Sequence, residues 1–233
     1  MKTTLKSTLA FGLIVAATVL TSTAEAKIHS SSKELVVMEA RDLPEQAQLP
    51  GNSLFLHSNN AGSTYLYVEQ QQGARLSVFD VTDPARIKLV VSMPLAAEGA
   101  FDFIRPLGNN AELVYFRDGQ KQAVLDLRKA RRPVFRVIST AANFGSAESM
   151  GQSALLATTQ PYNYVSAVGR NYQVIDISAS VPAQLATVDD VRHQVTNDET
   201  GTTFLLGPNG LTVVRRLNVE NDYKEQQYQT RGN

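Results

Sequence analysis

The 233-residue sequence contains no cysteine and no tryptophan. Without cysteine the chain can form no disulfide, and it has no thiolate for nucleophilic chemistry or for a cysteine-based metal site. Its fold must therefore be held together by burial of apolar side chains, for which a chain of this length is sufficient. The missing tryptophan disfavours, though weakly, a surface on which sugars stack.

The sequence also lacks an excess of charge and a second long apolar run. Lys and Arg number 22, as do Asp and Glu. A general nucleic-acid binder is expected to be basic, so we expect no nucleic-acid partner. A spanning helix needs about 20 apolar residues. Beyond the N-terminus no segment is that long and apolar, so we predict no transmembrane segment in the mature chain.

The N-terminal segment has the three parts of a secretory signal peptide. Lys2 and Lys6 supply positive charge, Leu9–Leu20 is an apolar run, and Ala24–Ala26 offers small residues for cleavage. The alternative is an uncleaved anchor, for which this run is too short. We therefore predict a signal peptide at residues 1–26, removed after Ala26.

The rest of the chain is predicted to form a single domain outside the cytoplasm. Residues 27–33 are rich in serine and are interpreted as a disordered linker, and residues 34–233 as the folded domain. We expect a periplasmic or extracellular protein, because a cleaved signal peptide directs export.

A short pattern that ends in aspartate in three of its four copies recurs every 39 to 50 residues, which is about the length of one β-propeller blade. In each unit a strand rich in aromatic or apolar residues precedes the pattern, with a Gly- or Asn-containing turn between them that suits a hairpin. The four patterns are Leu76–Asp80, Gln122–Asp126, Tyr172–Asp176 and Leu211–Arg215. The preceding strands are Tyr65–Val68, Leu113–Phe116, Tyr162–Val165 and Thr203–Leu206.

Each hairpin is flanked by further strands, and four strands make one blade. First strands are predicted at 53–57 and 100–104, and outer strands at 87–91, 134–138 and 185–188. The sequence therefore predicts an all-β fold, a small β-propeller of about four four-stranded blades. A fifth blade is the alternative if the N-terminal segment holds more than one strand.

The chain ends are predicted to meet. Glu34–Val37 resembles the outer strand at 88–91 and could complete the last blade, which removes an open sheet edge. Tyr223–Thr230 is the alternative occupant of that place. We predict no long amphipathic helix in the mature chain, and Ala141–Met150 is interpreted as a short helix or a loop.

The segment Leu76–Pro84, LSVFDVTDP, resembles the LVIVD repeat of bacterial β-propellers. The second unit lacks the Asp-Pro pair but has Pro133, the third has Ser180 where Pro84 stands, and the fourth has Arg215 instead of aspartate. The resemblance covers residues 34–216. It implies an exported or surface propeller and no particular reaction.

Three aspartates recur at the ends of the repeated strands: Asp80, Asp126 and Asp176. They could face the propeller axis as metal ligands. The structural interpretation is favoured, in which each carboxylate accepts backbone N–H groups of the following turn, helped by Thr82 and Ser178. A residue type repeated in every blade suits such a turn better than a single site.

One strong charge cluster stands out, made of Arg128, Lys129, Arg131, Arg132 and Arg136. It could bind phosphate groups of lipid A, anionic lipid headgroups or an acidic protein partner. The alternative is a solvated loop whose charges keep a sheet edge from aggregating. The cluster is the best candidate surface in the sequence.

No catalytic, cofactor-binding or metal-binding residues are predicted. His29, His57 and His193 stand without a second ligand at metal-like spacing, and no nucleophile or phosphate-loop motif accompanies them. Alternating tyrosines are interpreted as packing between blades. Asn143–Met150 is a candidate lip of a binding face. The tyrosines are Tyr65, Tyr67, Tyr115, Tyr162 and Tyr164.

These features favour an exported, non-catalytic binding or scaffold module with a protein or an anionic envelope component as its partner, and without a cofactor. The first alternative is a metal-dependent propeller hydrolase of the lactonase or esterase type. It requires Asp80, Asp102, Asp126 and Glu148 to converge in the central channel. The second is an envelope-associated structural protein that uses the basic surface at 128–136.

Overall fold

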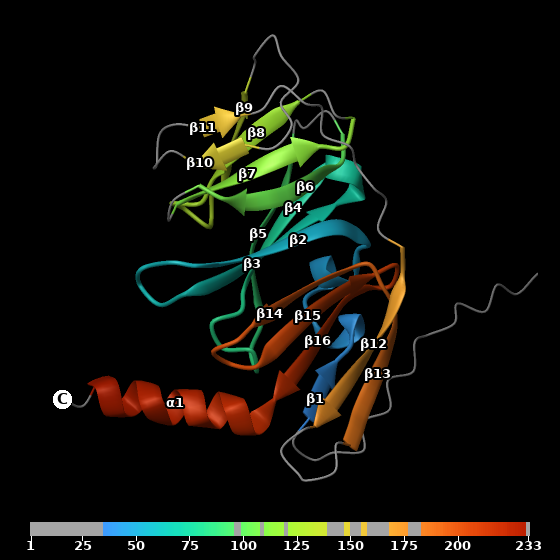
Figure 1. Cartoon of the computed structure of the whole chain (residues 1–233), viewed down its shortest axis with the longest axis vertical. Coiled ribbons are helices and arrows are strands. Elements are labelled where there is room, and N and C mark those ends of the chain that lie inside the picture. Colours follow the sequence, from blue (N-terminus) through green and yellow to red (C-terminus); the bar gives the residue numbers. More distant parts are fainter. Residues whose placement is uncertain are drawn as a thin grey trace, which may run out of the picture.

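Figure 1 shows the protein as a computed structural model. The predicted signal peptide, the linker and the predicted strand at 162–165 lie outside the residues that it describes. The structure describes residues 35–95, 99–107, 110–118, 121–138, 147–149, 155–157, 168–176 and 183–231.

The first two units each form one four-stranded antiparallel sheet, as the repeats predict. Their strands are joined in sequence order, each paired with the next. The first sheet contains β2 (Gly51–Ser58), β3 (Thr64–Gln70), β4 (Arg75–Asp80) and β5 (Lys88–Pro94). The second sheet contains β6 (Phe101–Pro106), β7 (Ala111–Phe116), β8 (Gln122–Asp126) and β9 (Val134–Ile138).

The last unit is completed by the N-terminal strand. β1 (Leu35–Met38) pairs with β16, so that the order in the last sheet is β1-β16-β15-β14. The register runs from Leu35 opposite Arg216 to Met38 opposite Val213. The predicted pairing of the two chain ends is therefore confirmed. The other strands of this sheet are β14 (His193–Asn197), β15 (Thr202–Gly207) and β16 (Gly210–Arg216).

The third unit is described in parts. β12 (Arg170–Asp176) and β13 (Ala183–Val191) form a two-stranded sheet, the pair expected from the third repeat. β10 (Ala147–Ser149) pairs with β11 (Leu155–Ala157) in a second small sheet. The prediction of a loop or helix over 141–150 is thus wrong for 147–149, where pairing with β11 decides the conformation.

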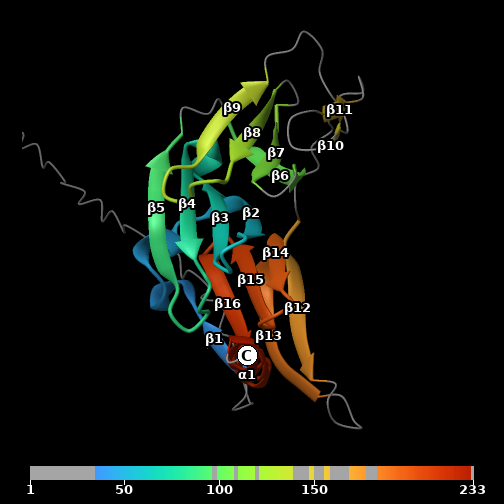
Figure 2. The same cartoon turned by 90° about the vertical axis from the view of Figure 1, so that its left-hand side faces the viewer.

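Apolar clusters join the sheets face to face (Figures 1 and 2). The first sheet packs on the last through Leu66 and Phe204, and on the second through Tyr67 and Phe101. β13 packs on the last sheet through Val188. The β12–β13 pair and the second sheet lie at opposite ends of the stack in Figure 1. The protein is all-β, and its four-stranded antiparallel sheets resemble propeller blades.

The C-terminal segment is a helix, α1 (Leu217–Arg231), rather than a closing strand. The prediction that Tyr223–Thr230 competes for the last blade is wrong, because β1 fills that place. The prediction of no long amphipathic helix is not contradicted, because α1 lacks an extended apolar face; its sequence is rich in Glu and Gln, which favour helix. No helix in the described part of the chain is both long and apolar enough to cross a membrane.

Two glycines make close approaches between segments possible. Gly73, with φ +88°, lies where a Cβ would be 1.8 Å from the carbonyl oxygen of Gly99. Gly210, with φ +97°, would place one 2.5 Å from the carbonyl oxygen of Ala47. Any other residue would clash and strain the backbone there. The short 3-10 helices are η1 (Ala40–Asp42), η2 (Glu45–Gln48) and η3 (Gln71–Gly73).

Candidate functional site

The repeated aspartates of the first two units accept hydrogen bonds from the turns that follow them. The Thr82 N–H donates to Oδ1 of Asp80 at 3.0 Å, and the Arg128 N–H donates to Oδ1 of Asp126 at 3.1 Å. Both carboxylates thus stabilise a turn two residues onward, as Asx turns do. The side chain of Asp176 lies outside the description.

The backbone that enters these turns is also the same. The Val81 N–H donates to the carbonyl of Thr64 at 2.9 Å, and the Leu127 N–H donates to that of Asn110 at 2.8 Å. These residues hold corresponding positions of the two repeats. The turns after β4 and β8 are therefore two copies of one structure.

The two copies carry opposite side chains at one decisive position. In the first turn the Arg86 N–H donates to the carbonyl of Asp83 at 2.9 Å, and the Arg86 Nε lies 2.7 Å from Oδ2 of Asp83. In the second turn the Arg132 N–H donates to the carbonyl of Lys129 at 2.8 Å. Lys129 stands where the first repeat has its aspartate. The ion pair is therefore replaced by two cations.

Two of the cluster's arginines are balanced by Asp126. The Arg128 Nε lies 2.9 and 3.0 Å from the two carboxylate oxygens, and the Arg136 Nη2 lies 3.5 Å from one of them. The hydrogen bonds from the Arg128 side chain are the main cause that lowers the pKa of Asp126 to about 2. One carboxylate thus faces two guanidinium groups and is fully ionised at neutral pH.

The other three cations of the cluster have no such partner. Lys129, Arg131 and Arg132 are exposed, and no carboxylate of the described residues lies within ion-pair distance of them. We call Arg128–Arg132 the basic turn. It carries four cations, and Arg136 adds a fifth on the next strand. This predicted surface is therefore a compact, largely uncompensated positive patch.

The basic turn leads directly into an exposed strand. β9 is the edge of the second sheet within the described residues. Val134 and Val137 are 46% and 52% exposed. In the matching edge strand of the first sheet, β5, the residues corresponding to Arg136 and Val137 are Val90 and Val91, and both are half-buried. Of these two edge strands, β9 is the one that combines exposed apolar side chains with an arginine within the strand.

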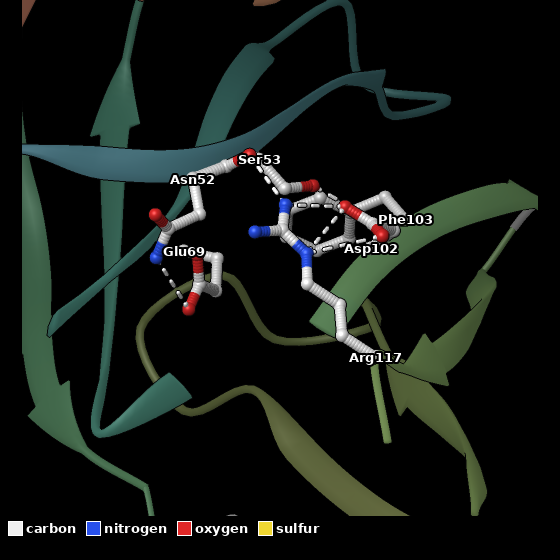
Figure 3. A network of polar contacts seen from close by, with 6 residues as sticks. All are labelled: Asn52, Ser53, Glu69, Asp102, Phe103 and Arg117. Atoms are coloured by element: carbon white, nitrogen blue, oxygen red, sulfur yellow. Dashed lines mark hydrogen bonds and ion pairs between the residues drawn. The ribbon is translucent and has the colours of Figure 1, made fainter. Parts of the chain in front are cut away.

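The strands at which neighbouring sheets meet carry polar side chains, and an ion pair lies beside them. β2 contacts both β6 and β14. Figure 3 shows Arg117 against Asp102, with Nη2–Oδ1 at 2.7 Å and Nε 3.2 Å from each carboxylate oxygen. The same guanidinium donates to the carbonyl of Asn52 at 2.8 Å. The hydrogen bond to Asn52 therefore links the largely buried ion pair of the second sheet to the first sheet.

Glu69 is a buried carboxyl beside this ion pair (Figure 3). Asn52 donates to its Oε1 at 3.3 Å, while Oε2 has no hydrogen-bond partner among the described groups. Burial raises the pKa of Glu69 to about 7, against the opposing effects of Asn52 and Arg117. Sequence reasoning missed this group, although an acidic residue within an otherwise apolar strand was a visible signal.

The histidines occupy separate places. Burial lowers the pKa of His193 on β14, and Arg117 acts in the same direction while Asp102 opposes it. His193 therefore lies within the field of the inner ion pair. His57 instead stacks on Phe55, with ring centroids 6.2 Å apart, and burial lowers its pKa. His29 lies outside the described residues.

Among the acidic residues that the hydrolase alternative would need, Asp102 does not converge with Asp80 and Asp126. Asp102 lies at the beginning of β6 and Asp126 at the end of β8, and these strands are parallel within one sheet. The two carboxylates are therefore at opposite ends of that sheet, and Asp80 ends β4 as Asp126 ends β8. The side chain of Glu148 is not described. Among described residues no three His, Asp or Glu side chains could hold a metal ion.

The fourth repeat differs from the others because it ends in a helix. Arg215 replaces the aspartate, and its Nε and Nη2 lie 2.7 and 2.8 Å from the two carboxylate oxygens of Glu220. Both side chains are buried, at 8% and 2% exposure. This bidentate ion pair attaches α1 to β16, so the departure from the repeat has a structural cause.

Packing between blades is confirmed for Tyr67, whereas the described apolar neighbours of Tyr115 all belong to its own sheet. Tyr67 lies in the apolar cluster between the first and second sheets, and Tyr115 in a cluster on the other face of the second sheet. Tyr65 packs at the edge of the former. Tyr162 and Tyr164 lie outside the described residues, as does most of the predicted lip at 143–150.

Comparisons with known proteins add little. No family model matches the chain, and no curated protein matches it. Among solved structures it is similar to the crystal structure of Saccharomyces cerevisiae Sqt1, with 8% identity and a TM-score of 0.29. The match covers 75% of this chain and 46% of that one, so the chain spans less than half of its length. A TM-score this low carries no argument about function.

Proposed function

We propose that the protein is an exported, non-catalytic binding or scaffold module that holds an anionic partner on its basic turn. Export rests on the predicted signal peptide at residues 1–26. The partner is a protein or an anionic component of the cell envelope. The resemblance to LVIVD-repeat propellers is part of the same proposal, because it implies an exported fold without a fixed reaction.

One observation carries the proposal. The turn after β4 makes the same backbone–backbone hydrogen bonds as the turn after β8, and it does so with an internally neutral Asp83–Arg86 pair. The fold therefore does not require Lys129 or an unpaired Arg132. Clustered like charges repel one another, and they become favourable when an anionic ligand neutralises them. The turn itself does not need these charges, so we assign them a role in binding.

Internal pairing at the inner strands supports a non-catalytic role. Arg117 and Asp102 satisfy each other and the backbone of Asn52, so they bind the two sheets together. A metal-dependent hydrolase is the alternative, and metal analysis of protein purified without chelators distinguishes the two. One bound metal ion per chain, with hydrolysis of ester or lactone substrates, would favour that alternative.

The experiment is co-sedimentation of the purified protein with the envelope fraction of the producing cell. The test variant is Lys129→Asp, which restores the acidic residue of the first repeat beside Arg132. The control is Lys88→Glu, an equal change of charge at the exposed start of β5. We expect Lys129→Asp to weaken binding about tenfold at low salt and Lys88→Glu to leave it within about twofold. Equal binding of all three proteins would contradict the proposal.

A further inference from the structure

We infer that the partner is an acidic polypeptide segment in an extended conformation, which adds as a fifth strand to the β9 edge of the second sheet. The inference rests on the proposed function and deepens it. It names the chemistry of the partner and the way in which the partner is held.

The backbone of β9 supplies the first part of the argument. β9 pairs with β8 through all five of its residues, from Val134 opposite Asp126 to Ile138 opposite Gln122. In the described part of the chain no strand pairs with its other side. An edge strand presents alternate N–H and C=O groups outward, and an extended peptide can satisfy them by strand addition.

The side chains of β9 supply the second part. Val137 lies opposite Ala123, on the face that packs toward the first sheet, whereas Val134 lies opposite Asp126 on the other face. Both valines are about half exposed. An added strand would cover one valine with each face, because its side chains alternate between the faces of the sheet. Apolar side chains that are exposed on both faces of one sheet edge suit an added strand better than a partner with a flat surface.

The charges supply the third part and give the partner its sign. The basic turn lies at the N-terminal end of β9, and Arg136 lies within the strand at 63% side-chain exposure. Every strand pair that the structure describes within the sheets is antiparallel. An antiparallel added strand would place its C-terminal end beside the basic turn. The partner segment should therefore be apolar at alternate positions and acidic at its C-terminal end.

A lipid headgroup or a polysaccharide phosphate could use the turn but not the strand. Neither has the repeating N–H and C=O groups that an edge strand pairs with, and neither would cover both valines. The neighbouring β5 edge provides an internal comparison, since its residues between Lys88 and Pro94 are half-buried and its turn is neutralised by Asp83. The combination of open edge, exposed valines and positive charge is found on β9.

The test uses protein expressed from the full sequence and three probes. The first is a fluorescent peptide of five alternating threonine and valine residues followed by three glutamates. The second is a pair of peptides of the same sequence, each N-methylated at one of the two sets of alternate amides, so that each has one edge that cannot pair. The third is a vesicle containing phosphatidylglycerol. Anisotropy measures peptide binding, co-sedimentation measures vesicle binding, and hydrogen exchange measures protection of the β9 amides.

We expect the unmodified peptide to bind and to slow exchange in β9 but not in β5. Methylation on the pairing edge should weaken binding at least about tenfold, because the strand hydrogen bonds are lost. Both N-methylation registers are tested, so that one of them blocks the pairing edge. Lys129→Asp should weaken binding to a similar extent, and Lys88→Glu should have little effect. Far-ultraviolet circular dichroism checks that both variants are folded.

Other outcomes separate this inference from the proposed function. If both methylated peptides bind as well as the unmodified one and β9 gains no protection, strand addition is wrong, while charge-dependent binding by the turn stands. If only the vesicles bind, and Lys129→Asp abolishes that binding, the partner is a lipid and the inference is overturned. If Lys129→Asp changes neither peptide nor envelope binding, the proposed function fails as well.

Discussion

The turns after β4 and β8 are one structure with two charge patterns. Their backbone hydrogen bonds correspond one to one, yet Asp83 neutralises Arg86 in the first, while Lys129 leaves Arg132 unpaired in the second. The hydrogen bonds accepted by Asp80 and Asp126 belong to the repeat and support the fold. The side chains between them are free to differ, and we propose that binding of an anionic partner accounts for the difference.

The helix that follows β16 extends the comparison, and breaking the ion pair that attaches it should have the largest effect. Arg215→Ala leaves Glu220 charged and buried, so we expect a loss of about 3–5 kcal/mol in the free energy of unfolding. Chemical denaturation followed by circular dichroism measures it. Arg41→Ala is the control, since its ion pair with Glu39 is exposed and should contribute less than about 1 kcal/mol. Similar small losses in both variants would show that Glu220 is solvated.

The buried carboxyl beside the inner ion pair should make stability depend on pH. The pKa of Glu69 is about 7 when folded and near 4.5 when unfolded, so the folded state binds the extra proton between these values. Stability should therefore fall as pH rises from 4.5 to 7. Glu69→Gln should remove roughly 1–3 kcal/mol of that fall. Glu112, whose pKa burial raises to about 8, should leave a remaining slope.

Thermal unfolding of wild type and Glu69→Gln at pH 5 and pH 8 measures this difference. Glu69→Gln should be more stable than wild type at pH 8 but not at pH 5. If the variant is more stable than wild type by the same amount at both pH values, Glu69 does not become ionised between them. That result would contradict its assignment as a desolvated carboxyl.

Removing the charge of Asp126 should separate its role in the turn from its role toward the arginines. Its pKa is lowered from 3.8 to about 2, so the stability that it contributes is present above pH 4 and is lost as pH falls toward 2. Asp126→Asn keeps an acceptor for the Arg128 N–H and should cost about 1–2 kcal/mol at pH 7. Asp80→Asn should cost less, because no arginine side chain binds Asp80. If Asp126→Asn lowers the free energy of unfolding equally at acid and at neutral pH, the charge of Asp126 does not stabilise the fold.

The smallest expected effect comes from the aspartate of the neutral turn. Asp83→Ala removes an exposed ion pair with Arg86 and one turn hydrogen bond, to the Ala85 N–H at 3.1 Å. We expect a loss of about 0.5–1 kcal/mol in stability, measured by denaturation. Lys129→Ala should lose nothing, since Lys129 makes neither contact. A loss of similar size at Lys129 would mean that the two turns depend on their side chains alike.

Much of the fold follows from the sequence because the strand pattern recurs every 39 to 50 residues and its strands end in turn formers. The repeated pentapeptides lie in strands, and the hairpins of the first, second and fourth units appear where predicted. The pairing of β1 with the last unit joins distant segments, and the likeness of Glu34–Val37 to the outer strand at 88–91 predicts it. Helix α1 does not follow from any apolar periodicity. It depends on the buried pair of Arg215 and Glu220, five residues apart, which gains meaning only when both are desolvated.

The candidate site could be found only in part. The basic cluster is visible in the sequence as a run of charges, but its division into paired and unpaired cations is not. Pairing of Arg128 and Arg136 with Asp126 depends on the register of β8 and β9, and the exposure of Val134 and Val137 depends on which sheet covers which edge. The inner network of Asn52, Glu69 and Arg117 joins segments far apart in sequence, so no local pattern could predict it.

The most direct test exchanges the two decisive residues in one protein. The double variant Asp83→Lys with Lys129→Asp has the composition and net charge of wild type, and only the place of the unpaired cations changes. Co-sedimentation with the envelope fraction at low salt is the measurement. The account predicts that binding falls at least about tenfold while the protein stays folded. Binding equal to that of wild type would contradict it, because net charge alone would then explain the interaction.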